Sequence, residues 1–176
     1  MPTVLREHMK RQIEPIALAK DIRQAVSETL DRPFTEKIDH QIFKPDQKIL
    51  ALWAADCAER VLPYFEEKYP NDERPRKAIE VLHEWIRTGV FRMAVIRGAS
   101  LSAHAAAKGK AEADAIFAAH AAGQAVATAH VPTHALSCSL YCIRAVAAHS
   151  GNVDDGLVKE RRRQLKRLRW HVDQRK

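Results

Sequence analysis

The stretch that decides the fold is AEADAIFAAHAAGQAVATAH, residues 111–130. Half of its residues are alanine, and the same enrichment extends over residues 99–148. Alanine has the highest helix propensity of the common residues, and its small side chain lets two helices approach closely. We therefore predict that this part of the chain consists of helices that pack tightly against one another.

Periodic apolar residues predict further helices on both sides of this stretch. Ile49, Trp53, Cys57 and Val61 recur every four residues, as on the buried face of a helix, and Asp46 precedes them as a capping residue. Strand signals are nearly absent. The predicted helical segments are residues 3–30 (with a break at Pro15 as an alternative), 46–62, 72–88, 90–108, 111–130, 132–149 and 154–172. The sequence thus predicts an all-α fold, a compact multi-helix bundle of about six to eight antiparallel helices.

The organisation that we predict is one helical domain over residues 1–176. A hydrophobic fraction of 46% in 176 residues is enough for one proper core. Within this domain, residues 1–45 form an N-terminal helical region and a connector. Residues 46–150 form the alanine-rich core, and residues 151–176 form a basic C-terminal helix.

The formal net charge of +7 is concentrated in that C-terminal helix. Residues 157–176 contain nine Lys or Arg and two acidic residues, and the difference of seven equals the net charge of the whole chain. An apolar stripe of Val158, Leu165, Leu168 and Val172 indicates that the helix packs on the bundle. Its basic residues are a candidate face for an acidic protein or for the phosphates of a nucleic acid. They are Arg161, Arg162, Arg163, Lys166, Arg167 and Arg169.

No catalytic motif occurs in the sequence, and we predict no catalytic residue and no cofactor. The HExxH zinc motif, the GxSxG nucleophile motif and a glycine-rich phosphate loop are all missing. His130 and His134 have the spacing by which two imidazoles share a metal on one helix. However, Pro132 lies between them and is expected to divide two helices. We therefore predict no metal site and keep this histidine pair as the weaker alternative.

The targeting and redox signals predict a cytoplasmic protein without a membrane span. No apolar run approaches the roughly 20 residues that a transmembrane helix needs, and the N-terminus lacks the layout of a signal peptide. The three cysteines, Cys57, Cys138 and Cys142, lie among apolar and small residues. We interpret them as small buried hydrophobic residues in a reducing compartment.

Asp56 is a candidate for a structural ion pair between helices. It lies beside Trp53 and Cys57 on the apolar stripe, and a partly buried carboxylate needs a partner. Arg60, four residues later, is the local candidate. Arg74 and Arg76 at the start of the following helix are candidates from another part of the chain.

Three stretches together resemble a known family. They are ALWAADCAER at residues 51–60, YPNDERPRKAIE at residues 69–80 and AGQAVATAHVPTHA at residues 122–135. In combination they resemble the immunity protein 5-like helical domains of bacteria and archaea, and the resemblance covers residues 48–148. It implies a non-enzymatic protein that binds and neutralises a cognate toxin of a polymorphic toxin system. The acidic bias that is usual among immunity proteins is absent, which argues against a basic nuclease as that toxin.

The sequence thus leaves three functions to compare. The leading one is a non-enzymatic immunity protein whose partner is a cognate protein toxin. The alternative is a nucleic-acid-associated protein that uses the basic C-terminal helix, and the third is a metal-dependent helical-bundle enzyme. The alanine-rich faces are expected either to be buried within one chain or to form a homodimer.

Overall fold

The structure, a computed structural model, describes residues 3–30, 45–150 and 153–174. This part of the chain contains helices and turns and no strand, so the all-α prediction is confirmed. Eight helices occur in it, one of them a single turn, within the predicted range of six to eight. They are α1 Thr3–Thr29, α2 Pro45–Val61, α3 Pro63–Glu66, α4 Arg74–Thr88, α5 Met93–Ala106, α6 Ala113–Ala127, α7 His134–Ser150 and α8 Val153–Asp173.

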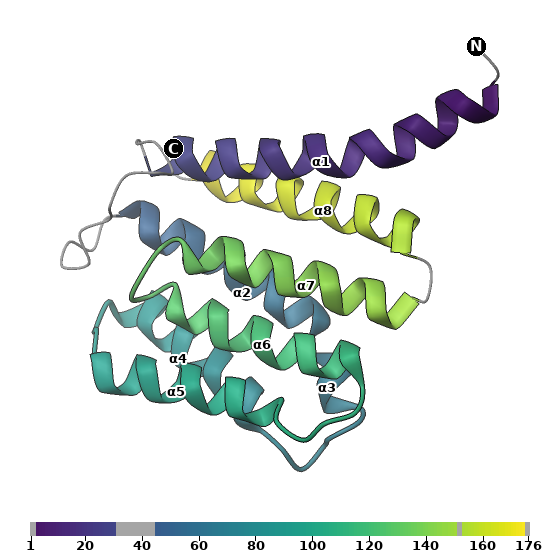
Figure 1. The fold of residues 1–176 in the computed structure, drawn as a ribbon. Helices are drawn as coiled ribbons and strands as arrows, with labels where there is room; N and C mark the ends of the chain where they lie inside the picture. Colours follow the sequence, from purple (N-terminus) through teal and green to yellow (C-terminus); the bar gives the residue numbers. More distant parts are fainter. Residues whose placement is uncertain (1–2, 31–44, 151–152, 175–176) are drawn as a thin grey trace.

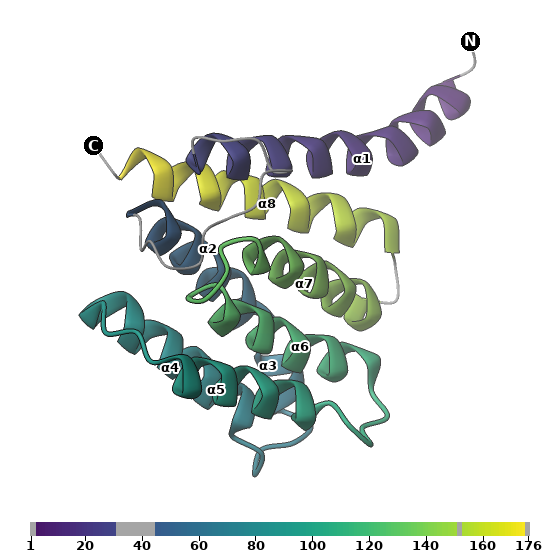
Figure 2. The same ribbon diagram turned by 60° about the vertical axis from the view of Figure 1, so that its left-hand side comes forward.

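The helices are stacked from one end of the molecule to the other. Helices α1 and α8 lie side by side at one end, α2 and α7 follow, and α4, α5 and α6 lie at the other end (Figures 1 and 2). Helix α2 contacts α4, α6, α7 and α8, which places it in the interior. The first and the eighth helix therefore close one end of the bundle together.

The core is centred on the stripe of α2 that the sequence predicted. Trp53 and Val61 are completely buried, and Ile49 and Cys57 are buried as well. Leu82 of α4 and Val126 of α6 are also fully buried in the same cluster. Burying a large apolar side chain contributes roughly 1.5–3 kcal/mol, so this cluster is a main source of stability.

The alanine-rich faces of α6 and α7 are buried within the chain. Most of the alanines in α6 are fully inaccessible to solvent, and α6 and α7 form the most extensive helix pair. Gly123 of α6 lies so close to α5 that an added Cβ would be 2.8 Å from Nε2 of His104. The alanine content is thus explained by packing inside one chain, and a homodimer stays a prediction.

Several helix boundaries differ from the predicted ones. Helix α1 continues through Pro15, where a break was an alternative, and its N-terminal part is inclined relative to the rest (Figure 1). One proline bends a helix without ending it when packing holds the flanking turns, and the contacts of α1 with α8 supply that packing. Gly89 and Gly109 follow α4 and α5 with positive φ angles of 70° and 71°, as expected of helix-ending glycines.

The C-terminal helix packs on the bundle. Leu165 and Leu168 are buried, and Val172 is partly buried against the core. Cys57, Cys138 and Cys142 are buried free thiols, as predicted. None of the helices in the described ranges is long and apolar enough to cross a membrane.

Candidate functional site

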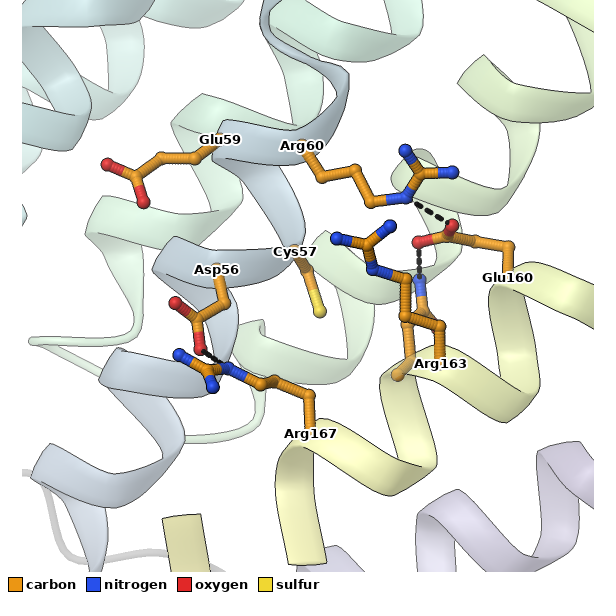
Figure 3. A pocket seen from close by; sticks show the side chains of 8 residues that line it. Asp56, Cys57, Glu59, Arg60, Glu160, Arg163 and Arg167 are labelled. Atoms are coloured by element: carbon orange, nitrogen blue, oxygen red, sulfur yellow. Dashed lines mark hydrogen bonds and ion pairs between the residues drawn. The ribbon is translucent and has the colours of Figure 1, made fainter. Parts of the chain in front are cut away.

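A cleft of about 400 Å³ lies between α2 and α8, and we call it the α2–α8 cleft. Seven of its eight lining residues are polar or charged (Figure 3). They comprise three acids and three arginines, so the formal charges of the lining balance. The lining residues are Asp56, Cys57, Glu59 and Arg60 of α2, and Glu160, Arg163, Gln164 and Arg167 of α8.

The two walls are held together at the base of the cleft. The indole Nε1 of Trp53 donates a hydrogen bond of 2.9 Å to the backbone oxygen of Gln164. The side chain of Gln164 in turn donates to the backbone oxygen of Ser139 on α7, at 3.1 Å. All three residues are buried. These bonds fix the position of α8 against α2 and α7, and with it the positions of the charged groups on the rim.

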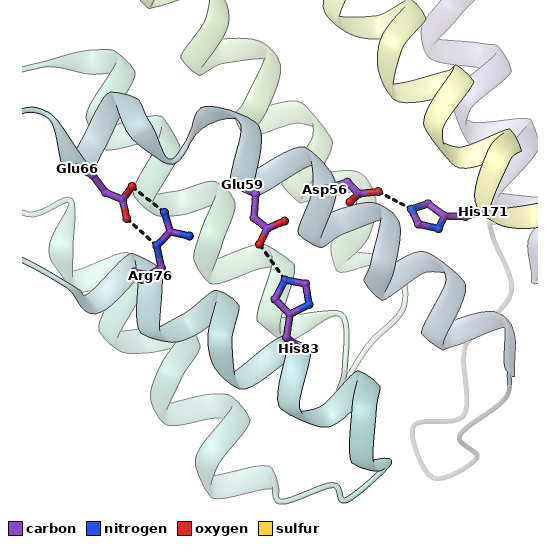
Figure 4. Close-up of polar contacts among 6 residues, drawn as sticks. All are labelled: Asp56, Glu59, Glu66, Arg76, His83 and His171. Atoms are coloured by element: carbon purple, nitrogen blue, oxygen red, sulfur yellow. Dashed lines mark hydrogen bonds and ion pairs between the residues drawn. The ribbon is translucent and has the colours of Figure 1, made fainter.

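Asp56 is paired with two groups on α8. Its Oδ2 accepts a hydrogen bond of 2.5 Å from Nε of Arg167 and another from Nε2 of His171 (Figures 3 and 4). Burial alone would raise the pKa of Asp56, but the bonds from His171 and Arg167 outweigh it and hold this pKa below the ordinary value of 3.8. Asp56 is therefore a carboxylate at neutral pH.

Glu160 is the second charged anchor. Its side chain is only 1% exposed, and its Oε2 accepts a hydrogen bond of 2.8 Å from Nε of Arg60. Its Oε1 accepts a longer bond of 3.4 Å from Gln164. A buried carboxylate is tolerated only when it is paired and hydrogen-bonded. Arg60 therefore stabilises Glu160 as well as the contact between the two helices.

Arg163 differs from the other two arginines of the cleft. Its guanidinium lies inside the cleft near Arg60 (Figure 3). Among the described residues, none accepts a hydrogen bond from Arg163. Glu59 is already occupied by His83 of α4, at 2.9 Å (Figure 4). Arg163 thus presents up to five N–H donors to whatever enters the cleft.

The predicted ion-pair residues do not meet one another. Asp56 bonds to α8, and the three predicted arginines bond elsewhere. Arg60 pairs with Glu160, Arg74 pairs with Asp72 two residues away at 2.6 Å, and Arg76 forms two bonds of 2.7 and 2.8 Å with Glu66 (Figure 4). The reason is geometric: α8 runs beside α2 and presents a partner of opposite charge to Asp56 and to Arg60 separately.

The six basic residues of the predicted C-terminal face point to several sides of α8. Arg162 pairs with Glu14 of α1, and Arg167 pairs with Asp56. Arg161 lines a second cleft beside α1 and α7, and Arg163 lines the α2–α8 cleft. Lys166 and Arg169 are exposed. Two of the six are therefore paired with acids on other helices, and Arg161 and Arg163 line different clefts.

The predicted histidine pair is divided by the turn that contains Pro132. His130 lies in that turn beside the ring of Phe91, whereas His134 begins α7 and donates through Nδ1 to Oε1 of Gln124 at 2.7 Å. The described residues contain no group of three His, Cys, Asp or Glu that could hold a metal ion. A different pair does meet: Nδ1 of His104 and Nδ1 of His120 lie 2.7 Å apart.

Sequence reasoning missed three residues of the site. Glu160, Gln164 and His171 are all buried polar residues of α8. Together with Arg167 they follow the helical spacing i, i+4, i+7 and i+11, a polar stripe beside the apolar one. This periodicity was one available signal. Glu160 was a second signal by itself, because it is one of only two acids in the basic segment of residues 157–176.

Comparison with known proteins identifies a family. A model of the family described as Imm-5 like putative immunity protein matches residues 40–170, which include both walls of the α2–α8 cleft. This match confirms the resemblance found in the sequence and extends it beyond residues 48–148 at both ends. No curated protein and no solved structure matches the chain. Because the match covers well over half of the 176 residues, the chain belongs to the family of Imm-5 like putative immunity proteins.

Proposed function

We propose that this protein is a non-enzymatic immunity protein that binds and neutralises a cognate protein toxin. The observation that carries the proposal is the family match over residues 40–170. The matched region contains the residues that build the α2–α8 cleft, from Asp56 on α2 to Arg167 on α8. The proposal thus assigns a binding role to a cleft that the family region forms by itself.

The chemistry of the cleft supports binding rather than catalysis. Burial, together with the nearby Cys142, Glu160 and Asp56, raises the pKa of the Cys57 thiol well above 9.0, so Cys57 is a neutral thiol and a poor nucleophile. The lowered pKa of Asp56 makes it a poor general acid at neutral pH. Glu160 is engaged by Arg60 and Gln164. Asp56 and Glu160 are thus engaged in contacts between helices, and Cys57 is a buried, neutral thiol.

The toxin group that fits the cleft best is a carboxylate. Arg163 offers hydrogen-bond donors there, and the acids of the lining are already paired. An Asp or Glu side chain of the toxin would form a charge-assisted bond with Arg163. The exposed Lys166, one turn away from Arg163 on the helix, adds positive potential that would accelerate association with an acidic surface.

Co-expression with each candidate toxin encoded beside the gene of this protein tests this proposal. We expect the intact protein to restore growth to cells that express the toxin, and to bind the purified toxin with a dissociation constant that calorimetry can measure. Arg163→Ala should weaken binding about tenfold or more, because it removes one charge-assisted bond at an interface. Arg97→Ala on the exposed face of α5 is the matched control and should bind like the wild type. A toxin that neither binds the wild-type protein nor loses its toxicity in its presence would refute the proposal.

A nucleic-acid-associated role is the second candidate, because Lys159, Arg163, Lys166 and Arg169 of α8 are exposed. Fluorescence anisotropy with mixed-sequence RNA and DNA at 50 and 200 mM salt tests it. Phosphate contacts would make the affinity fall steeply with salt. Replacing Arg163, Lys166 and Arg169 by Ala would then abolish binding, whereas replacing Lys20, Arg97 and Lys108 would not. Such a result would favour this role over the toxin-binding one.

A further inference from the structure

A second cleft, of about 370 Å³, lies between α1, α7 and α8, and we call it the α1–α7–α8 cleft. Its lining contains two arginines, three hydroxyl side chains and four apolar residues, and no carboxylate. The arginines are Arg23 of α1 and Arg161 of α8. This composition contrasts with the α2–α8 cleft, in which three acids balance three arginines.

Arg161 lacks the partner that its burial calls for. Its Nε is inaccessible to solvent and donates no hydrogen bond to any residue that the structure describes. The next residue, Arg162, has an ion pair with Glu14 of α1, and the lining of the cleft contains no carboxylate. A buried N–H without an acceptor is unfavourable, and natural structures rarely keep one unless a ligand or solvent satisfies it.

The charge of Arg23 adds to the unbalanced positive charge of the cleft. Burial lowers the pKa of Arg161, and the charge of Arg23 lowers it further. Arg23 itself forms no ion pair or hydrogen bond with another described residue. In this cleft two guanidinium groups repel each other, and no acid in the lining neutralises them. Proteins bind anions with arrangements of this kind.

The uncharged lining indicates the size and character of the ligand. Neither hydroxyl of Thr133 and Ser137 donates to another described group, whereas that of Ser139 donates to the backbone oxygen of Leu136 at 2.9 Å. Two hydroxyl groups therefore stand beside the two arginines with donor capacity left. The apolar part of the lining includes Ile22 and Leu140, and it would accept a short apolar group attached to the anion.

We propose that the α1–α7–α8 cleft is an oxyanion-binding site, in which Arg161 and Arg23 bind a phosphate or carboxylate group and the apolar walls hold a short group attached to it. Arg161 supplies a half-buried guanidinium from α8, and the exposed Arg23 covers the ligand from the open side. The proposal is independent of the toxin-binding role, because it concerns another face of α8 and needs no protein partner.

Titration of the purified full-length chain with inorganic phosphate, phenyl phosphate and butyrate tests the site. The Nε–H resonance of Arg161 in ¹H–¹⁵N NMR spectra reports binding directly. We expect a saturable shift of this resonance with at least one of the three probes. Saturation by phosphate or phenyl phosphate alone identifies a phosphate site, whereas saturation by butyrate alone identifies a carboxylate site. Stronger binding of phenyl phosphate than of inorganic phosphate supports the role of the apolar walls.

Three variants separate specific binding from general attraction to a basic protein. Arg23→Gln should weaken binding about tenfold through the loss of a charge-assisted bond. Arg161→Gln should abolish the saturable protection against heat that the ligand gives, measured as a shift of Tm. Arg169→Gln, on the same helix but outside this cleft, should leave the affinity unchanged. If Arg161→Gln does not fold, Arg23→Gln still decides the question, because Arg23 is exposed.

Two results would contradict the proposed oxyanion site. A shift that does not saturate up to 100 mM of any probe would mean that no oxyanion site exists here. An equal loss of affinity in Arg23→Gln and Arg169→Gln would show that only the total positive charge matters. Either outcome leaves the toxin-binding proposal untouched, since that one is measured on the α2–α8 cleft.

Discussion

At the scale of single residues, the Arg60–Glu160 pair gives the sharpest prediction. Arg60→Met leaves a carboxylate that is 1% exposed without its charged partner, and we expect a loss of about 2–3 kcal/mol in the free energy of unfolding, since Arg60 itself is partly screened by solvent. Glu160→Gln should cost less. The double variant should lose less stability than the two single losses added together, because it contains no buried carboxylate without a partner.

Urea denaturation measures all three variants. Arg87→Met is the matched control, because Arg87 forms an ion pair with Glu84 in which both side chains are mostly exposed. We expect it to change the free energy of unfolding by less than about 0.5 kcal/mol. Strict additivity of the two single substitutions would contradict the assignment of Glu160 as a buried charge.

The His104–His120 pair predicts a dependence of stability on pH. Burial lowers the pKa of both residues below the ordinary 6.5, and the charges of His120 and His134 lower that of His104 further. At pH values below about 6.5 the unfolded chain therefore binds more protons than the folded one, and stability falls as the pH falls. The stabilisation from the neutral pair is complete above this range. We expect Tm to decrease from pH 7.5 to 5.5, and to decrease less in His120→Gln.

At the scale of helices, two glycines should respond to the same substitution in opposite directions. In α6, Gly123→Ala places a Cβ 2.8 Å from the His104 ring, so we expect a net loss of about 1–2 kcal/mol despite the better helix propensity of alanine. In α5, Gly98→Ala meets nothing within 4 Å and should gain about 0.5–1 kcal/mol. Thermal melts of both variants test this pair, and a gain at both positions would refute the close approach of α5 and α6.

The sequence predicted the helices better than the side-chain contacts between them. The apolar stripe of α2 has a local signal and was predicted correctly, and the glycines after α4 and α5 are local signals of helix ends. The partner of Asp56 had none, because Arg167 and His171 lie more than 100 residues away and meet α2 only through the packing of α8. The four-residue helix α3 was also missed, since Pro63 reads equally well as the end of the preceding helix.

At the scale of the whole molecule, α8 is part of the core. A chain that ends after Gly156 would lose the buried Glu160, Gln164, Leu165 and Leu168 and would expose the Trp53 wall of α2. The two leucines alone are worth about 4–10 kcal/mol, comparable to the whole stability of a domain. We expect this truncated chain to show no cooperative thermal transition in circular dichroism and rapid digestion by proteases. Lys166→Ala in the full chain should melt like the wild type, and an unchanged melt of the truncated chain would contradict the packing of α8.

The bond from Trp53 to Gln164 also has a consequence for biosynthesis. Its two partners are 111 residues apart, and a ribosome adds roughly 5–20 residues per second. The inner wall of α2 must therefore wait about 6–22 seconds in a nascent chain before α8 can cover it. During that time its tryptophan and its unpaired aspartate are open to chaperones, so the rate of translation sets how long the incomplete bundle stays exposed.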